Sequence, residues 1–252
     1  MKPFLRYSLL GLLAFLAFLL LLAPATLVTD RVAEHLPGFS VQNVSGSVTD
    51  GIAQGLHWRG NRIEQLSWDW QPLALLSGWL EAGLRSNDPD MQAVGKVAIA
   101  FDRSLRLRDA NGRMSLSRLA ALAGHKSPAQ GILEFSLRDL YLDANARPQS
   151  AYGAVHVLNL RVDLRQPLNL GDFTLQLTPV EPAGIQGVIE DHGGPLALQG
   201  TVKLFPDGRY HVDGQAAVRD PANQALRQAL SLLGPADANG RWPLNFSGVL
   251  AR

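Results

Sequence analysis

Short runs in which apolar and polar residues alternate recur along the chain. The run 133–137 reads Leu-Glu-Phe-Ser-Leu, and the runs 97–101, 158–164, 173–177 and 244–246 have the same period. A period of two is typical of β-strands with one buried face and one wet face. The sequence therefore predicts a mainly β fold, built as one curved antiparallel sheet with a few short helices.

Glycine- and proline-rich turns separate these runs. Pro206-Asp207-Gly208 predicts a hairpin between strands near residues 196–205 and 209–218. Three further turns are predicted, at Asn111-Gly112, Asn169-Leu170-Gly171 and Gly193-Gly194-Pro195. The alternation breaks at two places, Arg138-Asp139 and Val157-Leu158, which predicts β-bulges there.

Three segments favour short helices. The strongest runs from Pro221 to Leu233, where Asp220 is expected to cap the first turn. Its apolar residues recur at helical spacing and form one face: Ala222, Ala225, Leu226, Ala229, Leu230 and Leu233. A second helix is predicted from Ser117 to Ala123, and Pro72–Leu76 is expected to add a turn or two.

The N-terminus carries the most apolar segment of the chain. No charge occurs from Tyr7 to Thr29, whereas Lys2 and Arg6 precede this run. About 20 apolar residues in a helix span the hydrocarbon core of a bilayer. We expect a transmembrane anchor that includes six leucines, Leu9, Leu12, Leu13, Leu16, Leu19 and Leu20. The positive-inside rule places the N-terminus in the cytoplasm and the rest of the chain in the periplasm.

A cleaved signal peptide is the alternative interpretation of this segment. Ala23-Pro24-Ala25 has small residues at the spacing of a cleavage site. The apolar run is longer than the 7–15 residues usual in a signal, which favours a retained anchor. The predicted division is therefore residues 1–29 as leader and transmembrane helix and residues 30–252 as one periplasmic β-rich domain.

Composition narrows the classes of function. The net charge is +1, too small for the positive field that a nucleic-acid partner requires. There is no cysteine, which excludes disulfides and thiolate chemistry. None of the six histidines stands at metal-ligand spacing from another, and no catalytic fingerprint occurs. We therefore expect no metal, no cofactor, no catalytic residues and no enzymatic activity.

Two clusters have a functional and a structural interpretation. Glu190-Asp191-His192 is the densest group of titratable residues, but it precedes Gly193-Gly194, where a turn favours such residues. Trp68, Trp70 and Trp79 surround Pro72 and form a possible partner surface. Trp68 and Trp70 share the parity of Leu66, which favours a place in the core instead.

Six stretches stand in a recognisable order along nearly the whole chain. They are the apolar leader ending at Pro24-Ala25, residues 44–53 (VSGSVTDGIA), 66–72 (LSWDWQP), 75–80 (LLSGWL), 193–200 (GGPLALQG) and 208–210 (GRY). Together these stretches resemble the type II secretion system protein N family, also called general secretion pathway N proteins.

The resemblance implies an inner-membrane accessory component of the apparatus that exports folded proteins from periplasm to exterior. It implies no catalysis, and partners among the other inner-membrane subunits and the lipid bilayer. An anchor followed by an amphipathic β-rich domain is also similar to AsmA-like proteins, so a lipid-handling module is the alternative function. Fold similarity alone does not separate the two.

Overall fold

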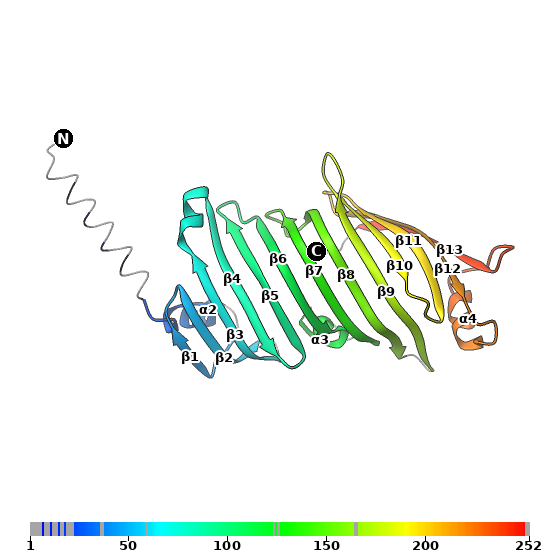
Figure 1. Cartoon of the computed structure of the whole chain (residues 1–252), viewed down its shortest axis with the longest axis horizontal. Helices are drawn as coiled ribbons and strands as arrows, with labels where there is room; N and C mark the ends of the chain where they lie inside the picture. Colours follow the sequence, from blue (N-terminus) through cyan, green and yellow to red (C-terminus); the bar gives the residue numbers. More distant parts are fainter. Residues whose placement is uncertain are drawn as a thin grey trace. The chain divides into compact units, whose positions relative to one another are not determined.

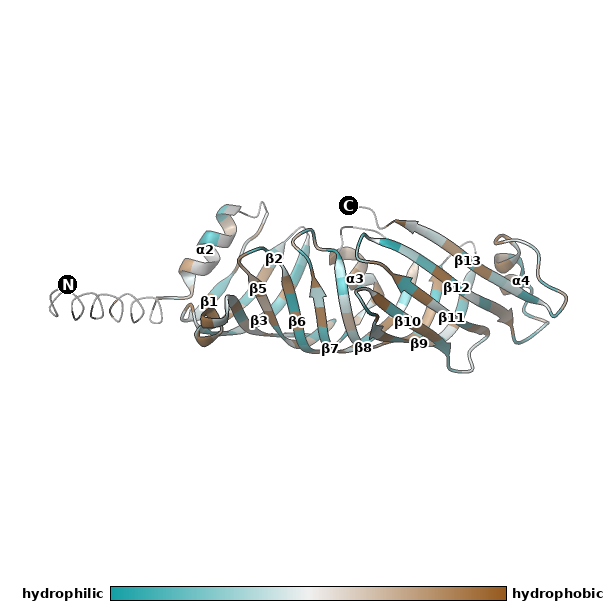
Figure 2. Cartoon of the chain, turned by 90° about the horizontal axis from the view of Figure 1, so that it is seen from above, coloured by the Kyte–Doolittle hydropathy of each residue, from teal (hydrophilic) through white to brown (hydrophobic). Residues whose placement is uncertain are grey.

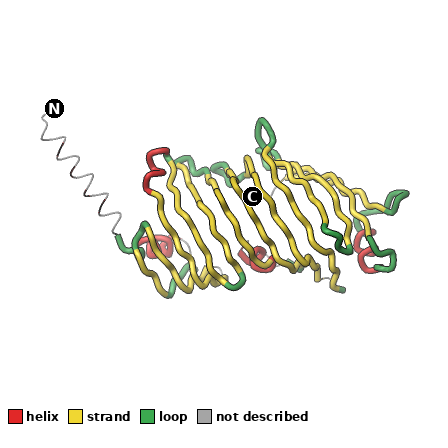
Figure 3. The backbone as a smooth tube through the Cα atoms, in the orientation of Figure 1, coloured by secondary structure: helices red, strands yellow, loops and turns green. Residues whose placement is uncertain are grey.

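The computed structural model describes residues 23–35, 38–58, 60–122, 124, 127–163 and 166–249, together with Tyr7, Gly11, Phe15 and Phe18. This part of the chain is mainly β, with thirteen strands that follow one another in chain order (Figures 1 and 3). The chain divides into two compact units, residues 1–88 and 89–252. The mainly β class with few helices is therefore confirmed.

The described residues of unit 1 form one α-helix, four strands and a 3₁₀ helix. These are α2 (Thr26–His35), β1 (Asn43–Gly46), β2 (Asp50–Trp58), β3 (Asn61–Gln71), η1 (Pro72–Ser77) and β4 (Trp79–Asp88). The four strands pair antiparallel, each with the next in the chain. Pro72 fits the start of η1 because its fixed φ suits a first helical turn. Gly78 ends η1 with φ of 82°.

In unit 2, the residues that the structure describes form nine strands and two helices. These are β5 (Met91–Ala100), β6 (Leu105–Ser115), α3 (Leu116–Leu122), β7 (Ala129–Leu142), β8 (Pro148–Asp163), β9 (Pro167–Pro179), β10 (Ile185–Asp191), β11 (Leu196–Leu204), β12 (Arg209–Val218), α4 (Gln224–Ser231) and β13 (Arg241–Val249). Every strand again pairs antiparallel with the next one in the chain.

The predicted hairpin and both predicted bulges are confirmed. Pro206-Asp207-Gly208 joins β11 to β12, and Gly208 takes φ of 87°. The pairing of β7 with β8 shifts between Leu137 and Asp139, and that of β8 with β9 shifts between Val157 and Leu160. An extra residue in one strand therefore produces each break in the alternation.

Two predicted turns are wrong, because their glycines serve close packing inside strands. Asn111-Gly112 lies within β6, where a Cβ on Gly112 would stand 2.6 Å from the ring of Phe135. Asn169-Leu170-Gly171 lies within β9, where a Cβ on Gly171 would stand 2.7 Å from Cα of Gly194. The predicted turn at Gly193-Gly194-Pro195 is confirmed and joins β10 to β11.

Strand register gives the unit 2 sheet one apolar and one polar face. Leu133 lies opposite Val157, which lies opposite Phe173, whereas the adjacent row joins Glu134, His156 and Thr174. Figure 2 shows the resulting alternation of apolar and polar residues along the strands. Directly opposed side chains share a face, so the alternation within each strand is matched across the sheet.

The core of unit 2 forms where α4 packs on the apolar face. Leu226 and Leu230 of α4 are buried against one group of residues, which comprises Phe173, Leu196, Ala216 and Trp242. Both leucines belong to the apolar helix face that the spacing of residues 222–233 predicts, and this face is the one that packs on the sheet. The helix begins later than predicted, since the Asn223 side chain accepts from Leu226 N at 3.1 Å, whereas Asp220 bonds to Ala222 N.

No helix among the described residues is long and apolar enough to span a bilayer. The six leucines predicted to form the anchor lie outside the described residues.

Candidate functional site

The predicted tryptophan surface lies on β3 and at the start of β4. Trp68, Trp70 and Trp79 are all half-buried. Trp68 donates from Nε1 to the Val48 carbonyl at 3.0 Å, and a Cβ on Gly51 would stand 2.3 Å from its ring. The Trp68 ring therefore packs on the β1–β2 turn within unit 1. The partner role of these tryptophans stays a prediction.

Three of the stretches that carry the family resemblance meet at this turn. Pro24 forms a bridge with Ser47, Ala25 N donates to Gly46 O at 3.1 Å, and Val48 N donates to Ala23 O at 2.8 Å. On the other side, Trp70 N donates to Thr49 O at 2.6 Å. Ala25 is only 1% exposed. Residues 23–25 are thus built into unit 1, at the end of the apolar leader.

Sequence reasoning missed an exposed apolar surface beside the tryptophans. It comprises Leu73, Leu75, Leu76 and Leu80, which we call the η1 leucine surface. Leu73 and Leu76 are 79% and 89% exposed, and η1 contains no buried residue. Residues three apart eclipse each other in a 3₁₀ helix, so these two side chains project in the same direction. Exposed large apolar side chains that are concentrated in one short segment are typical of a contact surface.

The Glu190-Asp191-His192 cluster mainly builds the turn after β10. The Asp191 carboxylate accepts from Gly193 N and Leu198 N, each at 3.0 Å, and from Arg219 Nη2 at 2.5 Å. Its side chain is 4% exposed. Burial would raise the pKa of the Asp191 carboxyl, but donation by Arg219 and the two amides outweighs it and holds the pKa below the ordinary value.

His192 belongs to a short hydrogen-bonded chain on the polar face. Thr174 Oγ1 lies 2.5 Å from His192 Nε2 and 2.9 Å from His156 Nδ1. Both imidazole rings thus contact one hydroxyl, and the three side chains hold one another in position on the polar face. Among the residues that the structure describes, no group of three His, Cys, Asp or Glu could hold a metal ion.

We expect Asp191→Asn to lower the free energy of unfolding by about 2 kcal/mol at neutral pH, since it weakens the hydrogen bonds that the buried carboxylate accepts from two amides and from the partly exposed Arg219. A carboxylate with a depressed pKa stabilises the fold above its unfolded-state pKa, near 3.9, and loses that contribution as pH falls through the lower folded-state value. The measurement is denaturant unfolding from pH 7 to pH 2. The difference in unfolding free energy between wild type and Asp191→Asn should become smaller below about pH 4.

The matched control for this prediction is Asp213→Asn on β12, where the aspartate is exposed. We expect its unfolding free energy to stay within about 0.5 kcal/mol of wild type. Equal effects of the two substitutions would contradict a structural role of the Asp191–Arg219 pair.

Comparison with known proteins identifies relatives of the whole chain. The family model described as "Type II secretion system (T2SS), protein N" matches residues 37–245. Type II secretion system protein N of Aeromonas hydrophila is 29% identical, covering 98% of this chain and 99% of the relative. The protein of the same name from Klebsiella pneumoniae is 28% identical, covering 98% and 97%. That of Vibrio cholerae serotype O1 is 26% identical, covering 90% and 96%.

No solved structure matches the chain. The expected likeness to AsmA-like proteins stays a prediction.

Proposed function

This chain belongs to the type II secretion system protein N family and so has a role in type II secretion, and we propose that it acts there as a non-catalytic accessory component of the inner membrane. The observation that carries this proposal is the family match, which spans residues 37–245 and therefore both β units. The titratable clusters described above hold turns and strands in place, which is consistent with a contact role rather than a reaction.

We propose that residues 1–29 form a retained anchor, with the N-terminus in the cytoplasm and the β units in the periplasm. The uncharged run from Tyr7 to Thr29 supports this topology, as do Lys2 and Arg6 before it. The packing of residues 23–25 also supports retention. Cleavage after Ala25 would remove a segment that is bonded to Gly46, Ser47 and Val48.

The η1 leucine surface is the proposed contact with other inner-membrane subunits of the apparatus. Leu73, Leu75 and Leu76 stand in a segment with no charged residue, between Trp70 and Trp79. A protein partner that covers these side chains would remove apolar area from water, at roughly 25 cal/mol per Å². The half-buried tryptophans would lie at the edge of such a contact.

We expect the double variant Leu73→Ser/Leu76→Ser to reduce exoprotein secretion several-fold while its thermal stability stays at the wild-type value. Exposed leucines contribute little to folding, so the loss would come from the missing contact. In-cell crosslinking from a photoreactive residue at position 75 should capture another inner-membrane subunit, and the double variant should weaken that product. Secretion is measured by the exoprotein fraction in the medium.

The control is Leu232→Ser/Leu233→Ser, which alters two leucines of unit 2 that are 85% and 52% exposed. We expect normal secretion from this variant. Normal secretion from the Leu73/Leu76 variant would remove the η1 leucine surface from the proposal. Crosslinks to phospholipid instead of protein would assign this surface to the bilayer.

One observation favours lipid handling as a second candidate function. Beyond the part of the apolar face that α4 covers, Leu175, Leu177 and Val202 are only half-buried, and Phe246 is 46% exposed. An apolar sheet face of this kind could receive acyl chains. A deletion strain separates the two functions: altered lipid composition of the outer membrane with normal exoprotein secretion would support lipid handling and contradict the secretion role.

A further inference from the structure

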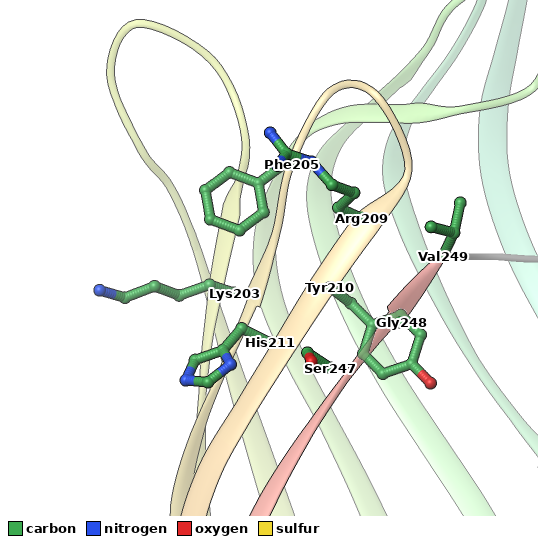
Figure 4. Close-up of a pocket in the computed structure, with 8 residues that line it drawn as sticks. All are labelled: Lys203, Phe205, Arg209, Tyr210, His211, Ser247, Gly248 and Val249. Carbon is green, nitrogen blue, oxygen red and sulfur yellow. The ribbon is translucent and has the colours of Figure 1, made fainter.

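A hollow of about 630 Å³ opens on the last three strands of unit 2, beside the hairpin that joins β11 to β12. Its lining consists of the polar residues Lys203, Arg209, Tyr210, His211 and Ser247, together with Phe205, Gly248 and Val249 (Figure 4). Figure 4 shows Lys203 and His211 on the same side of the strands, with the Tyr210 ring pointing to the opposite side. We call this feature the cationic hollow.

Strand register places three donors of the hollow in one row. Lys203 of β11 lies directly opposite His211 of β12, which lies directly opposite Ser247 of β13. Directly opposed residues have Cβ atoms about 4.5–5.5 Å apart. An ammonium, an imidazole and a hydroxyl therefore stand side by side, on three strands that hold them at fixed spacing.

These three side chains make no hydrogen bond or ion pair to any residue in the described ranges. Their donor capacity is therefore free. A lysine directly opposite a histidine also brings like charges together whenever the imidazole is protonated, which destabilises a sheet. A bound anion would remove that repulsion.

Arg209 supplies a second fixed cation at the mouth of the hollow. Its guanidinium lies over the Phe205 ring, 5.7 Å from the centroid, and its Nε donates to Asp207 at 2.6 Å. Asp207 also accepts from Arg209 N at 2.9 Å, so this carboxylate is engaged by Arg209. The other acid nearby on this face is Asp213, two residues beyond His211 and opposite Thr201 and Asn245. The row of Lys203, His211 and Ser247 contains no acid.

We propose that the cationic hollow binds a phosphate group, either free or on a phospholipid headgroup. A phosphate presents several strong acceptor oxygens in different directions, which suits separate donors on three strands. A carboxylate is best matched by the two-nitrogen edge of an arginine, and Asp207 already occupies Arg209 Nε. The cationic hollow belongs to unit 2, whereas the η1 leucine surface belongs to unit 1, so the proposal does not depend on the contact proposed there.

The test compares wild type with Lys203→Gln/His211→Gln in the full chain, reconstituted in phosphatidylcholine nanodiscs. Calorimetric titration with inorganic phosphate should show binding to wild type and at least tenfold weaker binding to the variant. Lys96→Gln/Arg161→Gln is the matched control, because it removes two exposed cations from other strands of unit 2. We expect this control to bind phosphate as wild type does.

A second arm distinguishes the two sources of the phosphate group. Wild-type nanodiscs are mixed with vesicles of phosphatidylcholine alone or of phosphatidylcholine with phosphatidylglycerol, and their association is measured by flotation. Vesicle binding that needs phosphatidylglycerol and is lost in Lys203→Gln/His211→Gln assigns the hollow to headgroups. Loss of phosphate binding without any change in vesicle binding assigns it to free phosphate compounds.

Two results would overturn the proposal. One is that wild type binds neither inorganic phosphate nor vesicles that contain phosphatidylglycerol. The other is that Lys96→Gln/Arg161→Gln loses as much binding as Lys203→Gln/His211→Gln. Thermal unfolding of each variant checks that it is folded. Lys203→Arg is a further variant, which keeps the positive charge at position 203. We expect it to retain most of the phosphate affinity, whereas a general folding defect at this position would weaken both variants alike.

Discussion

Introducing a charge at Leu226 is expected to lower the free energy of unfolding of unit 2 by about 4 kcal/mol. Leu226 is 2% exposed and packs with Leu230 against Phe173, Leu196, Ala216 and Trp242. Leu226→Asp would place a carboxylate where these apolar side chains leave no water, and it would also remove the contacts of the leucine. Leu230→Asp, at 8% exposure, should act similarly. Both variants should melt well below wild type.

Leu232→Asp is the control, because the same substitution is made at the end of the same helix on a side chain that is 85% exposed. We expect its unfolding free energy to change by less than about 0.5 kcal/mol. If all three variants had the same stability, α4 would not pack on the sheet in solution. Its apolar face would then become a surface available to partners.

Loss of the N-terminal segment is expected to abolish the secretion role. A chain exported by a cleavable signal, with Ala23 as its mature N-terminus, should fold and yet support no more exoprotein secretion than a deletion strain. In the proposed topology, a membrane tether raises the effective concentration of the β units at the apparatus to roughly the millimolar range, and a free domain loses this advantage. The measurements are exoprotein in the medium and the periplasmic level of the protein.

Two further variants with altered N-termini test the need for the anchor and the role of residues 23–25. A foreign transmembrane helix joined before Ala23 should restore secretion, since the tether rather than its sequence is needed. A mature N-terminus at Thr26 should be less stable by about 2 kcal/mol, because Gly46 O loses its donor Ala25 N and Val48 N loses its acceptor Ala23 O. Full secretion by the unanchored chain would contradict the need for an anchor. Mass spectrometry of the native protein that found Thr26 as its first residue would contradict retention.

Alternation and local turn chemistry were sufficient to predict much of the fold. The β11–β12 hairpin follows from Pro206-Asp207-Gly208, because a turn of this kind needs only its own residues. The bulges near Asp139 and Leu158 follow from breaks in the apolar–polar alternation, because one extra residue in a strand moves the following side chains to the other face of the sheet. Leu226 and Leu230 were identified by helical spacing alone.

The errors came from residues whose role depends on a distant partner. Gly112 and Gly171 look like turn glycines, but they lie in strands beside Phe135 and Gly194, which sequence reasoning could not bring near them. The start of α4 was misplaced for a more local reason. Asp220 and Asn223 both suit a helix cap, and the Asn223 side chain is the one that reaches Leu226 N.

The candidate sites were harder to predict than the fold. Lys203, His211 and Ser247 stand far apart in the sequence and become neighbours only through strand register. The η1 leucine surface did leave a signal. Residues 72–77 read Pro-Leu-Ala-Leu-Leu-Ser, which is too short a segment to bury three leucines against a sheet. An apolar segment of that length next to tryptophans could therefore have been interpreted as exposed.

The strand order described above bears on how the molecule is made. Within unit 1, each strand from β2 to β4 pairs with the strand synthesised just before it, and within unit 2 each strand from β6 to β13 does the same. Contacts between neighbours in the chain have a small loop-closure cost and favour fast folding. A chain threaded across a membrane from its N-terminus could therefore add each strand to a finished edge as it emerges. Each new strand would then pair soon after it emerges, which shortens the time in which an unpaired strand is exposed to aggregation.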